Sequence, residues 1–330
     1  MNAQPLPPQS PRASAAPKAR FDTWIVVGIS VLVLIFFFAW VPRYGPARDN
    51  SALGWLQSTW TEEADYAHGY AFPFLIAGLI LYQLKPLRAA ATNGSWLGLA
   101  VVFVGVVLYA AAYRTVQARV AVGALPILLW GSALTLWGWK SARLLAFPLF
   151  FFWLAIPVPF FQQATTGLQA MATSLAHFGS SLCGVETTVR GTDILPVHGN
   201  WAPLSIAGGC SGIRSLMALL MISAAWAYVA RIALWKKAIL FFAAVPLAIF
   251  GNALRVTSIF VIAEYGDAKW ARETWHDWSG LLLFYPISLL LLLSLHAVLE
   301  GGLPWKRPER QSLRRTVVAP THPDPLETPP

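Results

Sequence analysis

Residues 278–299 read WSGLLLFYPISLLLLLSLHAVL, an apolar run that contains no Asp, Glu, Lys or Arg. A helix needs roughly 20 such residues to cross the hydrocarbon core of a bilayer. The run therefore predicts a membrane span. Seven further stretches of the same character precede it, at 24–41, 67–84, 96–113, 120–138, 144–161, 212–230 and 238–263.

The composition indicates the same class of protein. Of the 330 residues, 56% are hydrophobic and only 12% are charged, whereas soluble domains carry about 25% charged residues. We therefore predict an all-α polytopic membrane protein with about eight transmembrane helices. The apolar run nearest the N-terminus, 24–41, resembles a signal peptide. No small-residue cleavage site follows it directly, so we interpret it as an anchor.

Basic residues give the predicted spans an orientation. If the N-terminus is cytoplasmic, each short inner connection carries Lys or Arg: Lys85 and Arg88, Lys140 and Arg143, and Arg231, Lys236 and Lys237. This asymmetry follows the positive-inside rule and predicts an N-in/C-in topology. The net charge of +9 is mostly this topological signal, so it does not indicate a nucleic-acid partner.

The sequence divides into two tails and a transmembrane domain. Residues 1–23 and 301–330 are rich in proline, alanine and charge, which predicts disordered cytoplasmic tails. Residues 24–300 form the predicted transmembrane domain. Its longest outer segment, 162–209, separates the fifth and sixth spans and is predicted to be a structured cap.

Two patterns describe this cap. An apolar stripe at helical spacing predicts an amphipathic helix in the outer membrane interface, formed by Leu168, Met171, Leu175, Phe178 and Leu182. Alternation then predicts a short β-hairpin, with Val185, Thr187 and Val189 before a turn at 198–200 and with Leu204 and Ile206 after it. His177 falls opposite the stripe and is predicted to be solvated.

Polar residues near the mouths of the spans are the functional candidates, because lipid makes such residues costly. Cys210, in GGCSGIRS, opens the sixth span from outside, and His276, in ETWHDWSG, opens the eighth. Arg255, in GNALR, lies about 12 Å short of the outer end of the seventh span. Asn252 lies on the same helix face and is predicted to orient the guanidinium. His68, in DYAHGYAFPF, marks the outer mouth of the second span.

Together these groups predict acyl-transfer chemistry at the outer leaflet. A helix N-terminus and a nearby cation favour the thiolate of Cys210. His276 can pass a proton to a leaving amine, and Arg255 can stabilise an oxyanion. We predict no cofactor and no metal, since the sequence has no H-E-x-x-H motif.

Each residue also has a structural interpretation that the sequence leaves open. Free cysteines are often small buried hydrophobes. Arg255 can form an ion pair with an outer carboxylate such as Glu264 or Asp277. His276 can belong to an aromatic belt with the neighbouring tryptophans.

The stretches GGCSGIRS, GNALRV and WHDWSG, with AHGYAFPF upstream, resemble the exosortase/archaeosortase family over roughly residues 50–300. The resemblance implies a sortase-like cysteine transpeptidase, with Cys210, Arg255 and His276 at the family's catalytic positions. The implied substrates are exported proteins with a C-terminal sorting signal of the PEP-CTERM kind, which comprises a short motif, a membrane helix and a basic end. Such substrates are commonly associated with exopolysaccharide production.

The implied location is a bacterial inner membrane, with the active site facing the periplasm and lipid as its surroundings. A thioester intermediate would be resolved by an amine acceptor or by water, and the residues do not distinguish these two fates.

Two rival functions remain at this point. Residues 209–212 spell G-C-S-G, which fits the G-x-S-G pattern of rhomboid-type serine proteases, with Ser211 as nucleophile and His276 as base. That dyad has no use for Arg255. A transporter that binds anions or relays protons would leave Cys210 unexplained. The second cysteine, Cys183, could pair with Cys210 in an oxidising compartment, but we predict that the two remain unpaired.

Overall fold

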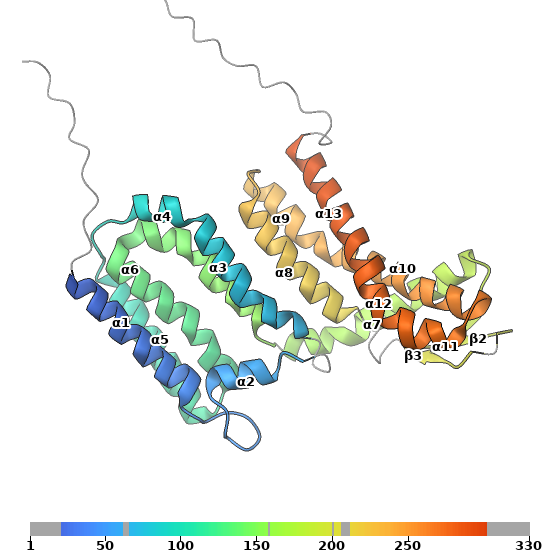
Figure 1. Ribbon diagram of the computed structural model, residues 1–330, viewed down its shortest axis with the longest axis horizontal. Helices are drawn as coiled ribbons and strands as arrows, with labels where there is room; N and C mark the ends of the chain where they lie inside the picture. The colour runs from blue at the N-terminus through green and yellow to red at the C-terminus, as the bar shows by residue number, and fades with distance from the viewer. Residues whose placement is uncertain (1–20, 62–65, 158, 200, 206–211, 302–330) are drawn as a thin grey trace, which may run out of the picture.

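The computed structural model describes residues 21–61, 66–157, 159–199, 201–205 and 212–301 (Figure 1). These residues are mostly helical, as predicted, with one small sheet. The two predicted tails lie outside the described residues, apart from the start of the first helix at Phe21 and from Gly301.

Helices and strands follow one another in two halves. The N-terminal half contains α1 (Phe21–Ile35), η1 (Phe36–Trp40), α2 (Ala52–Ser58), η2 (Ala67–Ala71), α3 (Phe72–Tyr82), α4 (Leu84–Ala90), α5 (Leu97–Thr115), α6 (Ala118–Phe150) and η3 (Phe151–Ala155). The C-terminal half contains α7 (Pro159–Leu182), β1 (Thr187–Arg190), β2 (Asp193–Pro196), β3 (Leu204–Ser205), α8 (Ile213–Val229), α9 (Leu234–Phe242), α10 (Ala244–Tyr265), α11 (Ala268–Trp270), η4 (Ala271–Trp275), α12 (His276–Ser279), η5 (Gly280–Phe284) and α13 (Tyr285–Glu300).

By length and apolar composition, four helical stretches in the described residues can cross a membrane. They are Leu97–Thr115, Ala118–Ala155, Leu234–Tyr265 and Ala268–Glu300. The count becomes five if Ala67–Tyr82 and Leu84–Ala90, which meet at a bend of 56°, form one span. The stretches Trp24–Trp40 and Ile213–Val229 are apolar but shorter. The chain is thus a multi-pass membrane protein, and this count does not reach the eight predicted spans.

One of these stretches, α6, folds back on itself. The Trp130 indole nitrogen donates to the carbonyl oxygen of Ala142 over 2.7 Å, although twelve residues of straight helix would span about 18 Å. The break falls at Gly138, whose φ of 74° and ψ of −179° are not helical. The predicted boundary between spans 120–138 and 144–161 is therefore observed as a turn between two antiparallel arms.

The end predicted for the second arm is wrong. Helical structure stops at Ala155, and α7 begins at Pro159 instead of continuing a span to residue 161. The cause is the sequence Pro157-Val158-Pro159, because proline has no N–H to donate within a helix and favours the first turn of a new one. The outer cap accordingly starts three residues earlier than predicted.

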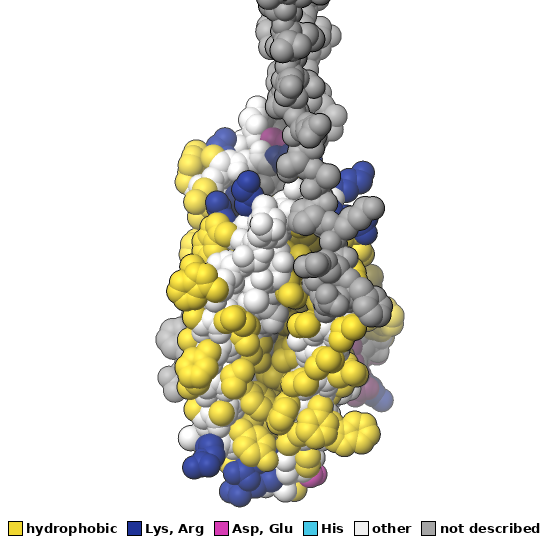
Figure 2. All heavy atoms as spheres, turned by 90° about the vertical axis from the view of Figure 1, so that its left-hand side faces the viewer, with side chains coloured by type: hydrophobic (Ala, Val, Ile, Leu, Met, Phe, Trp, Pro, Cys, Tyr) yellow, Lys and Arg dark blue, Asp and Glu magenta, His cyan; other side chains and the backbone are white. Residues whose placement is uncertain are grey.

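The side of the N-terminal half that faces away from the C-terminal half is apolar. Figure 2 shows a band of apolar side chains with Lys and Arg above and below it. Leu32 on α1 and Phe103 on α5 are both 68% exposed. Such a continuous apolar surface is too large for a soluble monomer and fits contact with lipid chains.

The predicted amphipathic helix is present as α7. Its small residues Ala172 and Ala176 are buried, and at Gly179 an added side chain would lie 2.3 Å from Thr257 of α10. Phe178 and Leu182, from the predicted apolar stripe, are exposed. The small face of α7 therefore packs on α10, while the apolar stripe points away from the protein. Its place in the membrane interface stays a prediction.

The cap contains a three-stranded antiparallel sheet in the order β1-β2-β3. The chain reverses twice here. Arg190 pairs with Asp193, so the first reversal is at Gly191 and Thr192, which the sequence did not predict. The segment that contains the predicted turn at 198–200 joins β2 to β3, which are also antiparallel. Gly191 has a φ of +65°, which glycine adopts more readily than other residues. Asn200 and Ile206 lie outside the described residues.

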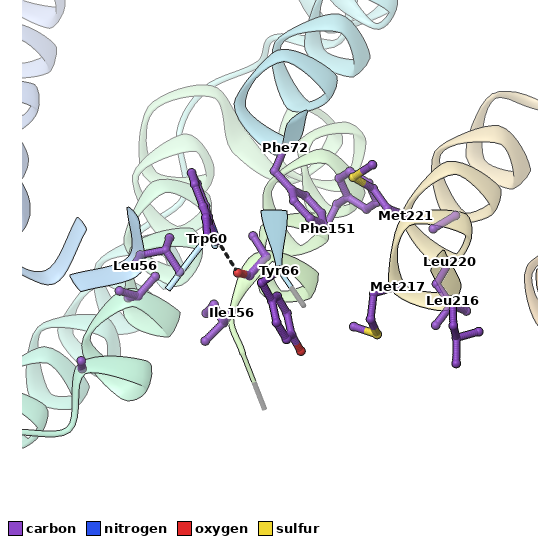
Figure 3. Packing of buried hydrophobic residues seen from close by; sticks show 14 of the residues in the cluster. Leu56, Trp60, Tyr66, Phe72, Phe151, Ile156, Leu216, Met217, Leu220 and Met221 are labelled. Atoms are coloured by element: carbon purple, nitrogen blue, oxygen red, sulfur yellow. Dashed lines mark hydrogen bonds between the residues drawn. The ribbon is translucent and has the colours of Figure 1, made fainter. Parts of the chain in front are cut away.

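A shared core joins the two halves of the protein. In Figure 3, Tyr66, Phe72 and Phe151 of the N-terminal half face Met217 and Met221 of α8, and all belong to one buried cluster. On the N-terminal side of this core, the Trp60 indole donates to the carbonyl oxygen of Ala155 over 3.0 Å. This packing places η2 against the first turns of α8.

Candidate active site

Arg255 is a buried candidate residue with two hydrogen-bond partners. It lies on α10 and is only 8% exposed. Its Nε donates to Ser279 Oγ over 3.0 Å, and its Nη2 donates to the carbonyl oxygen of His276 over 3.0 Å. The structure thus brings together two of the predicted site residues, from different helices.

The backbone around His276 has an unusual pitch. The short α12 lies between two π-helical turns, η4 and η5, and such turns occur frequently at functional sites. The carbonyl oxygen of His276 accepts a second hydrogen bond, from Ser279 Oγ, at 2.9 Å. Sequence reasoning missed Ser279, whose hydroxyl accepts a hydrogen bond from the guanidinium. The role predicted for Asn252 in orienting Arg255 stays a prediction.

The charge of Arg255 has only neutral partners. No carboxylate of the described residues lies within 4 Å of the guanidinium. The two carboxylates that the sequence offered as ion-pair partners have other contacts. Glu264 accepts a hydrogen bond from the Trp201 indole over 2.7 Å, and Asp277 contacts the His276 ring. A buried charge without a counter-ion is costly, so this site favours binding of an anion.

His276 has a carboxylate beside its ring. Its Nδ1 lies 3.0 Å from Asp277 Oδ1, and its side chain is 24% exposed. A carboxylate beside one ring nitrogen fixes the tautomer and orientation of an imidazole. Only one of the two neighbouring tryptophans fits the aromatic-belt interpretation. Trp278 is exposed, whereas the Trp275 indole donates a hydrogen bond to Ser258 Oγ over 2.8 Å.

Cys210 and Ser211 lie outside the described residues. The description resumes at Gly212, which has a φ of +76° and caps the start of α8. A side chain added at Gly212 would lie 3.0 Å from Asn252 Nδ2. Asn252 is 1% exposed and precedes Arg255 by one helical turn on α10. The chain therefore enters α8 next to the helix face that carries Arg255.

His68 lies on the N-terminal side of the same region. Its ring is flanked by Tyr66 and Phe72, with centroids at 5.3 and 6.2 Å. The turn that carries it, η2, packs against α8, whose first turn holds Arg214. Sequence reasoning did not single out Arg214 as a site residue, and its place four residues after Cys210 in the sequence was the available signal.

A cavity of about 250 Å³ lies one helical turn further along α10 from Arg255. Ile259 and Phe260 of α10 line it together with Trp201 and Arg272. Because Ile259 follows Arg255 by four residues, the two side chains lie on the same face of α10. The cavity offers space for part of a ligand near Arg255.

Other chemically active side chains are separate from this region. Cys183 is a free, exposed thiol at the end of α7. His177 is half-buried and lies 2.7 Å from Thr187 Oγ1, so it joins α7 to β1 and is not simply solvated as predicted. Within the described ranges, no group of three or more His, Cys, Asp or Glu side chains is arranged to hold a metal ion.

Residues 60–293 match a family model described as Transmembrane exosortase (Exosortase_EpsH). The matched region includes His68, Cys210, Arg255 and His276. No curated protein and no solved structure gave a significant match.

Proposed function

This chain belongs to the transmembrane exosortase family, and from that premise we propose that it is a cysteine transpeptidase or protease. Its substrates are exported proteins with C-terminal sorting signals of the PEP-CTERM kind. It cleaves them at the outer face of a bacterial inner membrane, through a thioester intermediate.

The buried charge of Arg255 is the observation that carries this proposal. Among the described residues the guanidinium has neutral partners only, the hydroxyl of Ser279 and the carbonyl oxygen of His276. Preorganised donors in a water-poor site stabilise developing negative charge with little reorganisation. A tetrahedral oxyanion is such a charge, and a thiolate is another.

Chain connectivity supports Cys210 as the nucleophile. Two peptide units separate it from Gly212, which limits the distance between the two α-carbons to about 7 Å. Gly212 contacts Asn252, one turn from Arg255 on α10. A thiol in this position has a nearby cation, which favours the reactive thiolate form.

The proposed reaction proceeds in two steps. His276 takes the proton of the Cys210 thiol, the thiolate attacks the scissile carbonyl carbon, and Arg255 stabilises the resulting oxyanion. As this intermediate collapses, the C–N bond breaks and His276 gives the proton to the leaving amine. An amine acceptor or water then attacks the thioester and loses a proton to His276, which returns it to the sulfur as the C–S bond breaks, so the thiol is regenerated. Asp277 keeps the imidazole oriented throughout.

The proposed topology has eight spans with both termini inside. Figure 1 shows α4, the α8–α9 connection and the end of α13 along one edge of the molecule, with α7 and the strands at the opposite side. Lys85, Arg88, Lys236 and Lys237 belong to the first edge. This distribution supports a cytoplasmic edge opposite an outer cap.

Reporter fusions test this topology. Fusions after residues 90, 142 and 234 are expected to read as cytoplasmic, and fusions near 55, 116, 195 and 270 as external, because the basic residues gather at the first set of positions. Paired reporters, one active only inside and one only outside, give an internal control at each position. A cytoplasmic reading near 195 would place Cys210 on the wrong side for an exported substrate.

The rival functions have less support. A rhomboid-type dyad of Ser211 and His276 does not use Arg255, whose side chain is hydrogen-bonded directly to the backbone of His276. A transporter gives no role to a thiol at the start of α8.

A further inference from the structure

We propose that His68 is a substrate-binding residue, and that its imidazole hydrogen-bonds the main chain of the peptide segment being cleaved. This inference rests on the proposed function and adds a contribution from the N-terminal half of the protein to the site.

The imidazole of His68 is buried without partners. Both of its ring nitrogens are buried, and neither has a hydrogen-bond partner within the part of the chain that the structure describes. Buried polar groups in native proteins are nearly always paired, and an unpaired one is usually associated with a function. Here two unpaired nitrogens belong to one side chain.

The side chains around His68 hold its imidazole ring in place. Tyr66 and Phe72 flank it, and Phe72 packs in turn on Phe151. At the next residue, Gly69, an added side chain would lie 2.2 Å from the Trp60 ring. The turn that carries His68 is therefore packed tightly against its surroundings, which restricts rotation of the imidazole toward solvent.

His68 lies close to α8, the helix that follows Cys210 in the sequence. The turn that carries it, η2, packs against α8, and Tyr66 and Phe72 belong to the same buried cluster as Ile213 of α8. At the start of α8, Gly212 lies against Asn252, one turn from Arg255 on α10. One helix, α8, therefore contacts both the turn that carries His68 and the helix that carries Arg255.

The chemistry of the ring selects the ligand. An uncharged imidazole has one N–H donor and one acceptor nitrogen. An extended peptide presents one C=O acceptor and one N–H donor per residue, and can therefore satisfy both nitrogens. Recognition of this kind does not depend on the side chains of the substrate.

Substitution of His68 tests whether this residue contributes to substrate binding or to the stability of the fold. In His68→Phe, the unpaired polar atoms are replaced by an apolar ring of similar shape, which leaves stability unchanged or raises it. We expect an unchanged or higher melting temperature in detergent, together with at least a tenfold loss of substrate processing. His68→Gln keeps a donor and an acceptor and is expected to recover part of the activity. His296→Phe is the matched control. His296 packs on Trp226 near Glu300, at the C-terminal end of α13, whereas His276 precedes the N-terminal end of that helix.

A binding readout distinguishes this inference from the proposed function. Photocrosslinking of substrate is compared in the Cys210→Ala background with and without His68→Phe, and capture is expected to fall with the loss of His68. Full processing and full capture by His68→Phe would overturn the inference and leave the proposed function intact. A melting temperature that falls together with activity would assign His68 a structural role. Absence of processing and capture with the unmodified protein would count against the proposed function itself.

Discussion

Cys210→Ala is expected to abolish cleavage of a co-expressed substrate that carries a C-terminal sorting signal, while Ser211→Ala retains most of the cleavage. Without the thiol no thioester forms, and alanine offers no alternative nucleophile. The ratio of precursor to product on a gel measures the effect. Membrane fractions of each variant provide the control for insertion, which is expected to persist in both.

The opposite pattern has a definite meaning. An inactive Ser211→Ala and an active Cys210→Ala would transfer the nucleophile to the serine and favour the rhomboid-type mechanism. Because the two residues are adjacent, damage to local folding would affect both variants alike.

Arg255→Ala is expected to lower the rate of processing by about 10²–10³, the usual cost of removing one donor to an oxyanion. Arg255→Lys should recover only a small part of that loss. Lysine keeps the charge, but it lacks the planar fork that now donates to Ser279 and to His276 at the same time. Single-turnover rates with a fixed amount of substrate measure both variants.

Arg43→Lys is a suitable matched control. Arg43 also donates its Nε to a backbone carbonyl, that of Tyr113, but it lies in the N-terminal half. Its substitution is expected to leave the processing rate unchanged. Normal cleavage by both Arg255→Ala and His276→Ala would show that neither residue is catalytic, and a binding or transport function would then explain the site better.

The sequence predicted the convergence of Arg255 and His276 for a simple reason. The alternation of apolar spans and basic connections determines which span mouths share a leaflet, and both residues lie near outer mouths. Ser279 was not predictable in the same way. Its contact with Arg255 depends on the local pitch of the helix between two π-helical turns, which residue spacing does not reveal.

The errors in the fold have a similar origin. The predicted cap had one reversal of the chain, near 198–200, whereas strand pairing adds an earlier one at Gly191 and Thr192. The apolar run that ends near residue 161 conceals a helix break, because hydropathy does not register the missing N–H groups of Pro157 and Pro159. The unpaired ring nitrogens of His68 are a tertiary property, which arises when Trp60, Tyr66 and Phe72 pack around one turn.

The central claim is that Cys210 forms a thioester with the substrate, and acid-quenched turnover tests it most directly. Unmodified protein is mixed with substrate, quenched, digested and analysed by mass spectrometry, with Cys210→Ala as the control. The account predicts that the peptide containing Cys210 carries the new C-terminal residue of the cleaved substrate, and that neutral hydroxylamine releases it. A substrate adduct on Ser211, or turnover without any adduct on Cys210, would contradict the account.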